Sequence, residues 1–171
     1  MQANLKRLNL LPASEAEGEL LKCCGSRYWA RQVAAARPFT SVEELTGKAE
    51  QFWWDLQPDD WLEAFHSHPK IGEKKAAAKT ALAAQKWSAQ EQSGVESSDE
   101  QVLNALAKLN RAYEEKFGFI FIVCATGKTS AEMLQLLRER LENPREVELR
   151  NAAAEQAKIT ELRLRKLIET E

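Results

Sequence analysis

Helix start signals recur along this chain and restrict its fold more than any other feature. A hydroxyl residue followed three positions later by Glu matches the capping box, in which the two side chains satisfy the first free amides of a helix. Four pairs have this spacing: Ser14 with Glu17, Ser41 with Glu44, Ser88 with Glu91, and Thr129 with Glu132. The pattern therefore predicts at least four helix starts.

The intervals between the glycines and prolines are rich in Ala, Leu, Glu, Lys and Gln, which favour helix. With the caps, they predict helices over 15–24, 27–36, 42–55, 59–67, 73–86, 99–116, 130–141 and 145–169. Only 119–125 looks like a strand, and one short apolar run cannot form a sheet by itself. We therefore expect an all-α, single-domain multi-helix bundle over 1–171, with one buried extended segment near 119–125.

Composition argues against several classes of protein. A net charge of −2 and a pI near 5.9 give no basic field that would attract nucleic acid. No apolar run is long enough to span a bilayer, and the N-terminus lacks the apolar centre of a secretory signal. Three cysteines, with Cys23 and Cys24 adjacent, argue against a disulfide framework and fit a reducing compartment. We expect no nucleic-acid or membrane partner and a cytoplasmic location.

Both histidines of the chain lie at the end of the expected helix 59–67. Pro69 pushes the residue before it out of the helical region, so His68 is expected just past the helix C-terminus. The negative end of the helix dipole favours a protonated imidazole, which suits a proton donor, although a plain helix cap explains His68 equally well. Because His66 and His68 have no further ligand at suitable spacing, we expect no metal site.

Four segments taken together resemble a known enzyme family. They are 65–72, which holds His68 and Pro69, then 87–94, 109–113 leading into 117–125, and 159–164. Their order and spacing are similar to those of 2-oxo-4-hydroxy-4-carboxy-5-ureidoimidazoline (OHCU) decarboxylase, over nearly the whole chain. The resemblance implies an all-helical enzyme of urate breakdown that needs no cofactor. Such an enzyme forms homodimers and converts OHCU to (S)-allantoin with release of carbon dioxide.

The resemblance also implies roles for particular residues. His68 corresponds to the catalytic proton donor, and Glu91 to a carboxylate that positions the substrate hydroxyl and pairs with the histidine. The residues expected to bind substrate are Pro69, Ser88, Gln92, Phe121, Ile122, Val123, Cys124, Ala125 and Arg163. The backbone of 121–125 would offer N–H and C=O groups to the planar ring, and the Arg163 guanidinium would contact a carboxylate or urea oxygen.

A non-catalytic helical protein-interaction module is the alternative interpretation. It explains the caps and the amphipathic pattern over 159–168, but not the His-Pro turn. Without the resemblance, Ser88 and Glu91 would read as a helix cap, and Arg163 as a surface charge. In the enzyme interpretation the protein need not supply an electron-accepting group, because the substrate ring itself can take up the electrons that carbon dioxide leaves behind. The chain would need to orient the carboxylate, stabilise an oxyanion and return a proton to one face of the ring.

Overall fold

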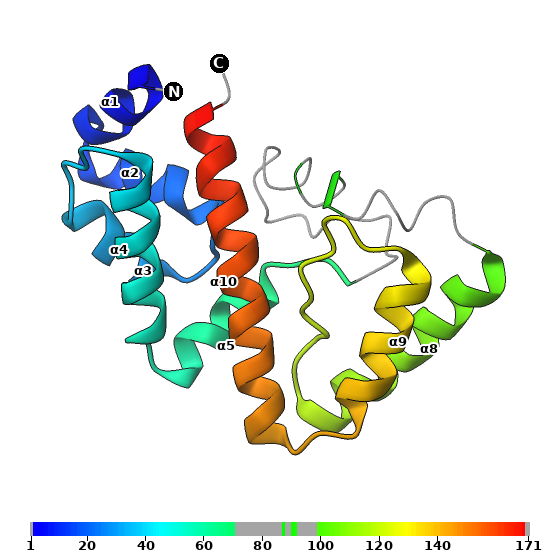
Figure 1. Ribbon diagram of the computed structural model, residues 1–171. Helices are drawn as coiled ribbons and strands as arrows, with labels where there is room; N and C mark the ends of the chain where they lie inside the picture. Colours follow the sequence, from blue (N-terminus) through cyan, green and yellow to red (C-terminus); the bar gives the residue numbers. More distant parts are fainter. Residues whose placement is uncertain (1, 71–86, 88–89, 92–98, 170–171) are drawn as a thin grey trace. The chain divides into compact units, whose positions relative to one another are not determined.

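Helices make up the regular structure of this protein in the part of the chain that the structure describes, and no strand occurs there (Figure 1). The computed structural model describes residues 2–70, 87, 90–91 and 99–169. The helices are α1 (Gln2–Leu10), α2 (Ala13–Leu21), α3 (Arg27–Ala35), α4 (Val42–Trp54), α5 (Pro58–His66), α8 (Glu100–Phe117), α9 (Ser130–Leu141) and α10 (Arg145–Glu169). The expected all-α fold is confirmed.

Most helix bounds agree closely with the sequence signals. Helices α9 and α10 have the expected bounds, and α3, α4, α5 and α8 differ by one residue at one or both ends. Helix α2 begins and ends a few residues early, and α1 was not expected. The expected helix over 73–86 lies outside the described residues.

The capping pairs have different outcomes. Thr129 forms a complete capping box with Glu132 at the start of α9. Ser41 caps α4 by accepting from the Glu44 amide, but the Glu44 carboxylate bonds to the backbone and hydroxyl of Thr40. Both helix starts are thus confirmed, one with a full box and the other with half of one. The Ser88 signal lies outside the described residues.

The Ser14 cap is wrong, because α2 begins earlier, at Ala13, after Pro12. The Pro12 carbonyl accepts hydrogen bonds from the amides of Glu15 (3.1 Å) and Ala16 (3.0 Å). Pro12 is thus the N-cap of α2, and its carbonyl accepts the first hydrogen bonds of the helix without a side-chain cap. Two side-chain caps that the sequence analysis missed are Ser26, at α3, and Asp99, at α8.

The chain forms two compact units, Met1–Ala64 with Ala157–Glu171, and Phe65–Gln156. In the first unit, Trp29 and Trp53 are fully buried. The Trp29 indole N–H donates to the Ala49 carbonyl, and that of Trp61 to the Trp53 carbonyl, each at 2.9 Å. These large rings are therefore buried without leaving a polar group unsatisfied.

The second unit has an aromatic core around the end of α8. Tyr113 lies 4.5 Å from Phe117 and 5.4 Å from Phe121, and Phe65 lies 5.7 Å from Phe119, between ring centroids. Full burial of each such ring contributes about 1.5–3 kcal/mol. The core therefore fixes the chain on both sides of the end of α8.

A buried, non-helical segment follows α8. Gly118 ends the helix with a φ of 79°, a left-handed conformation that glycine adopts without strain. Residues 121–125 are then buried without forming helix or strand. This confirms the buried segment expected near 119–125. No helix among the described residues is both long and apolar enough to cross a membrane.

Candidate active site

His68 lies just past the C-terminus of α5, as the His-Pro turn predicts. The helix ends at His66, Ser67 forms a turn, and the His68 amide donates to the Phe65 carbonyl at 3.2 Å. Both His68 and Pro69 are half-buried. The turn therefore presents the imidazole without removing it fully from solvent.

The imidazole of His68 is bonded to a residue that the sequence analysis did not identify. Its Nε2 lies 2.6 Å from Oε1 of Gln156, a fully buried side chain of α10. An amide oxygen accepts hydrogen bonds, and the imidazole can be its donor in the form that carries hydrogen on Nε2. The available signal was a polar residue on the same helix face as Ala152 and Ala153, which are also fully buried.

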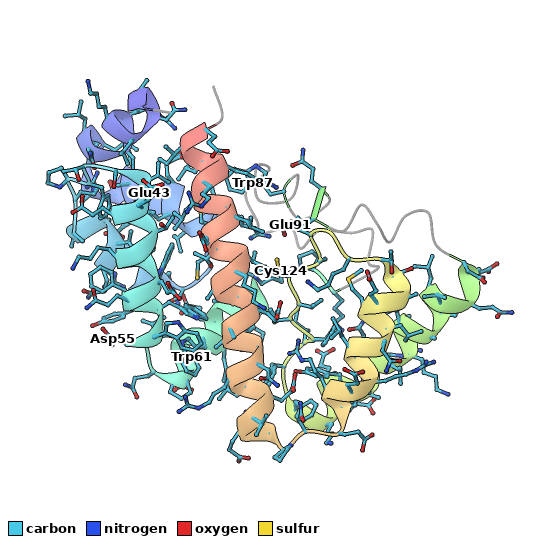
Figure 2. The ribbon with its side chains drawn as sticks, in the orientation of Figure 1. Glu43, Asp55, Trp61, Trp87, Glu91 and Cys124 are labelled. Atoms are coloured by element: carbon cyan, nitrogen blue, oxygen red, sulfur yellow. The ribbon has the colours of Figure 1, made fainter. Side chains whose placement is uncertain are left out.

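Glu91 is helical, half-buried and within electrostatic reach of Cys124 (Figure 2). Burial raises the pKa of the Cys124 thiol, and the charges of Glu155 and Glu91 raise it further. The backbone of Thr126 and the charge of Lys128 act in the opposite direction. Cys124 therefore stays a thiol near neutral pH, and Glu91 lies near the buried segment.

Side chains of the protein hold part of the buried segment's backbone. The Cys124 amide donates to Glu155 Oε2 at 2.8 Å, and its carbonyl accepts from Lys128 Nζ at 2.9 Å. The Ile122 carbonyl accepts from the guanidinium of Arg140. The Cys124 amide and the carbonyls of Ile122 and Cys124 therefore have partners within the folded chain, as buried polar groups require. The contacts of 121–125 with a ligand stay predictions.

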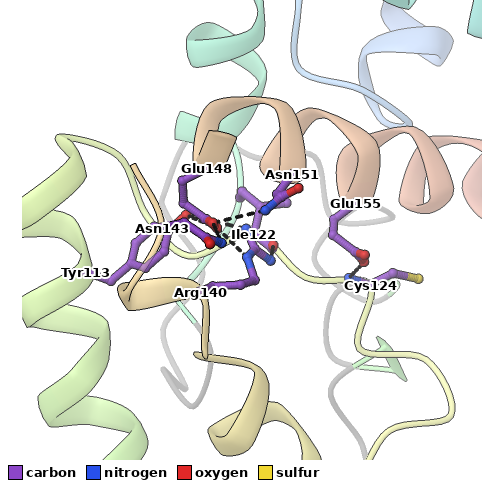
Figure 3. A network of polar contacts seen from close by, with 8 residues as sticks. All are labelled: Tyr113, Ile122, Cys124, Arg140, Asn143, Glu148, Asn151 and Glu155. Carbon is purple, nitrogen blue, oxygen red and sulfur yellow. Dashed lines mark hydrogen bonds and ion pairs between the residues drawn. The ribbon is translucent and has the colours of Figure 1, made fainter. Parts of the chain in front are cut away.

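A buried ion pair organises the contacts around this segment (Figure 3). Glu148 is fully buried and accepts from Tyr113 (2.7 Å), Asn143 (2.9 Å), Asn151 (3.2 Å) and Arg140 Nε. Such a pair compensates the cost of burying both charges only when these hydrogen bonds are all made. Burial is the main cause that raises the Tyr113 pKa above its usual range, so the phenol remains a donor.

Arg140 connects the ion pair to the segment in two ways. Besides the bond to the Ile122 carbonyl, its guanidinium lies over the Phe121 ring at 4.6 Å from the centroid. A planar guanidinium can stack on a ring and donate in its own plane at the same time. The residues Arg140 and Glu148 thus fix the backbone that the sequence analysis assigned to the substrate site.

Comparison with known proteins supplies the family. The family model described as OHCU decarboxylase matches residues 9–165. The chain belongs to the OHCU decarboxylase family.

Relatives of this chain include proteins of different length. The uric acid degradation bifunctional protein TTL of Arabidopsis thaliana is 42% identical over 151 residues, which cover 88% of this chain and 47% of that protein. The 2-oxo-4-hydroxy-4-carboxy-5-ureidoimidazoline decarboxylase of Mus musculus is 32% identical over 139 residues, or 81% of this chain and 78% of that protein. The chain thus spans about half the length of the plant relative.

A solved member of the family has the same fold. It is a crystal structure of OHCU decarboxylase in the presence of (S)-allantoin, with 42% sequence identity and a TM-score of 0.76. The similarity covers 88% of this chain and 96% of that one. The likeness therefore extends over the family domain in sequence and in structure.

The residues that the family resemblance assigns to the site fall into three groups. His68, Pro69, Glu91 and the segment 121–125 belong to the second unit. Arg163 belongs to the first unit, where it is buried. Ser88 and Gln92 lie outside the described residues.

Arg163 is not the surface charge that an isolated arginine would suggest. Burial raises the pKa of Cys23 and of Cys24, the latter to about 11, and the positive charge of Arg163 opposes both shifts. The three cysteines are free and buried. Arg163 therefore lies near the two adjacent thiols of the first unit.

Proposed function

We propose that this chain decarboxylates OHCU to (S)-allantoin, as a cofactor-free carboxy-lyase of urate breakdown. The observation that carries the proposal is the family match over residues 9–165, which includes every residue expected in the site. The solved relative, determined in the presence of (S)-allantoin, supports the product. The name of the plant relative supports the role in uric acid degradation.

The chemistry follows from the groups that the name of the substrate specifies. The bond between the ring carbon and its carboxylate breaks, its electron pair forms a double bond to the adjacent ring carbon, and the electrons of the carbon–nitrogen double bond move to the ring nitrogen, which leaves an enol. A proton then adds to the carbon that bears the ureido group, and the proton of the enol hydroxyl passes to the ring nitrogen as the carbonyl forms. Because the ring accepts the electrons, no cofactor has to serve as an electron sink.

In this proposal His68 supplies the proton that adds to the ring carbon, and Glu91 holds the substrate hydroxyl. Addition from one face only would give a single configuration at that carbon. The support is that His68 is held by a buried partner, and that Glu91 lies near a segment assigned to the site. The contacts to Pro69, Ser88, Gln92, the segment 121–125 and Arg163 remain predictions.

The direct test is to add the full chain to freshly generated OHCU and follow circular dichroism. We expect rapid formation of optically active allantoin above the slow, racemic spontaneous reaction, and the same rate after dialysis against a chelator. A helical interaction module would leave the racemic background unchanged. An unchanged background with folded protein would therefore contradict the proposed function.

Two further properties are proposals of the same kind. The family resemblance favours a homodimer, which light scattering on the full chain would measure. The composition favours the cytoplasm, which localisation of the tagged full chain in its own cell would test.

A further inference from the structure

The hydrogen bond between His68 and Gln156 is a contact of the second unit that the proposed function does not use. The two residues are 88 positions apart, and the distance of 2.6 Å is at the short end for a hydrogen bond. Gln156 is fully buried, so its amide oxygen has no bulk water with which to exchange this partner. A buried amide in this place costs stability unless its polar atoms are satisfied.

The residue before Gln156 makes a second long-range contact. Glu155 accepts from the Cys124 amide at 2.8 Å. Consecutive residues of α10 therefore hold two separate segments of the second unit, the His-Pro turn and the buried segment. Both segments carry residues that the family resemblance assigns to the site.

We propose that Gln156 is a positioning residue that keeps a hydrogen on Nε2 of His68 and thereby makes Nδ1 the nitrogen that gains and loses the catalytic proton. A neutral imidazole carries one hydrogen, and the amide oxygen accepts it from Nε2. The second hydrogen of the charged ring must then be on Nδ1. The inference deepens the proposed function, on which its catalytic part rests.

The proton transfer from His68 to the substrate conserves atoms and electrons. The Nδ1–H bond breaks and its electrons remain on Nδ1 as a lone pair. The π electrons of the enol form the new C–H bond at the carbon that bears the ureido group, and the enol hydroxyl proton passes to the ring nitrogen that received the electrons of the carbon–nitrogen double bond. His68 ends as the neutral ring with hydrogen on Nε2, still bonded to Gln156. Without this acceptor, part of the neutral population would have hydrogen on Nδ1 and a lone pair on Nε2.

The experiment is nitrogen NMR of the full chain labelled with ¹⁵N-histidine, at a pH of about 8.5, where an ordinary histidine with a pKa of about 6.5 is neutral. The chain has two histidines, so His66→Gln assigns the signals. We expect His68 of the unsubstituted protein to have hydrogen on Nε2 and a bare Nδ1. Hydrogen on Nδ1 instead would overturn the inference.

Substitutions separate positioning from a structural role. Gln156→Leu should give a mixture of the two neutral forms of His68 and lower kcat roughly 10- to 100-fold, with KM little changed, the range found when the partner that orients a metal-bound histidine is removed. Gln156→Glu retains an acceptor oxygen and should keep both the hydrogen on Nε2 and most of kcat. Gln135→Leu, at an exposed glutamine of the same unit, is the matched control and should change neither measurement.

The outcomes distinguish the two proposals. An unchanged His68 signal and unchanged kcat in Gln156→Leu would overturn the positioning role. If Gln156→Leu does not fold, the spectra of the unsubstituted protein and of Gln156→Glu still test the inference. Both proteins keep the acceptor oxygen, so hydrogen on Nδ1 of His68 in either one would overturn it. The NMR measurement needs no substrate. An inactive protein with the expected spectrum would therefore contradict the proposed function and leave the assignment of Nε2 intact.

Discussion

His68 and His66 are two positions apart but lie in different surroundings. His66 is the exposed last residue of α5, whereas the half-buried ring of His68 is bonded to Gln156. Because general acid catalysis contributes about 10²- to 10⁴-fold, His68→Ala should lower kcat/KM by a factor in that range. Initial rates of formation of optically active allantoin measure the loss. His66→Gln is the matched control and should retain the rate.

Glu91 should act together with His68. We expect Glu91→Ala to lose most of the rate enhancement, and the double variant with His68→Ala to lose little more, as found for groups that function as a unit. The measurement is kcat/KM for the two single variants and the double variant. Losses that simply multiply would show that the two residues contribute independently and would contradict the pairing.

Glu148 and Arg140 form the buried ion pair of the second unit. Glu148→Gln leaves the Arg140 charge without its partner and should lower the free energy of unfolding by about 3–5 kcal/mol. Urea unfolding followed by circular dichroism measures the change. Glu161→Gln, which breaks the exposed pair with Arg165, is the control and should have little effect. Equal effects of the two substitutions would contradict the account of the buried pair.

Some residues at the site could be predicted from the sequence, and others could not. His68 was predictable in position because the neighbouring proline acts locally. Gln156, Glu155 and Arg140 were not, because their partners are 88, 31 and 18 residues away along the chain. A helical pattern indicates which face of α10 is buried, but not which distant segment that face contacts.

The end of helix α8 depends on Gly118. Its φ of 79° is costly for a residue with a side chain, and nothing lies within 4 Å of an added Cβ. Gly118→Ala should therefore lower the free energy of unfolding by about 1–2 kcal/mol through backbone strain alone. Gly47→Ala is the matched control. It too has open space, lies within α4, and should raise stability by up to about 1 kcal/mol.

Both effects are measured by chemical denaturation of the full chain. The opposite signs are the discriminating result, since both substitutions add the same methyl group. Destabilisation by both would contradict this account, because the φ of Gly118 would then not be what distinguishes the two positions.

The start of α9 depends on the capping box of Thr129 and Glu132. Thr129→Ala should lower the free energy of unfolding by about 1 kcal/mol at neutral pH. Hydrogen bonds from the backbone and hydroxyl of Thr129 hold the Glu132 pKa below its ordinary 4.5 in the folded protein. The stabilisation by the carboxylate is therefore present above about pH 4.5 and is lost as the pH falls through the lowered pKa. The difference between the two proteins should shrink over that acid range in unfolding curves, and a difference that grows there would contradict this account.

The helices were more predictable than their arrangement. Capping residues, prolines and glycines act within one helical turn, so the bounds of α3, α4, α9 and α10 could be inferred from local sequence. Helix α1 was missed because no capping signal precedes it and its last residue, Leu10, is largely exposed. The contacts that join α8, α9 and α10 through Glu148 are tertiary, and no spacing within one element predicts them.

At the scale of the whole molecule, we expect the two units to unfold together. The chain enters the second unit near the end of α5 and returns to the first within α10, so two helices contribute residues to both units. Because helix formation is cooperative along the chain, loss of one unit should unwind part of the other. The single-domain prediction therefore expects one calorimetric transition whose measured and van't Hoff enthalpies agree. Two separate transitions would contradict it.

Helix α10 carries Glu148, Asn151 and Glu155 on one side (Figure 3). Each added residue turns an α-helix by about 100°, so an insertion between Glu148 and Glu155 would swing the latter away from the Cys124 amide and take Gln156 with it. Loops elsewhere absorb changes in length at low cost. We therefore expect the number of residues in that stretch of α10 to be more constrained than the length of an exposed loop.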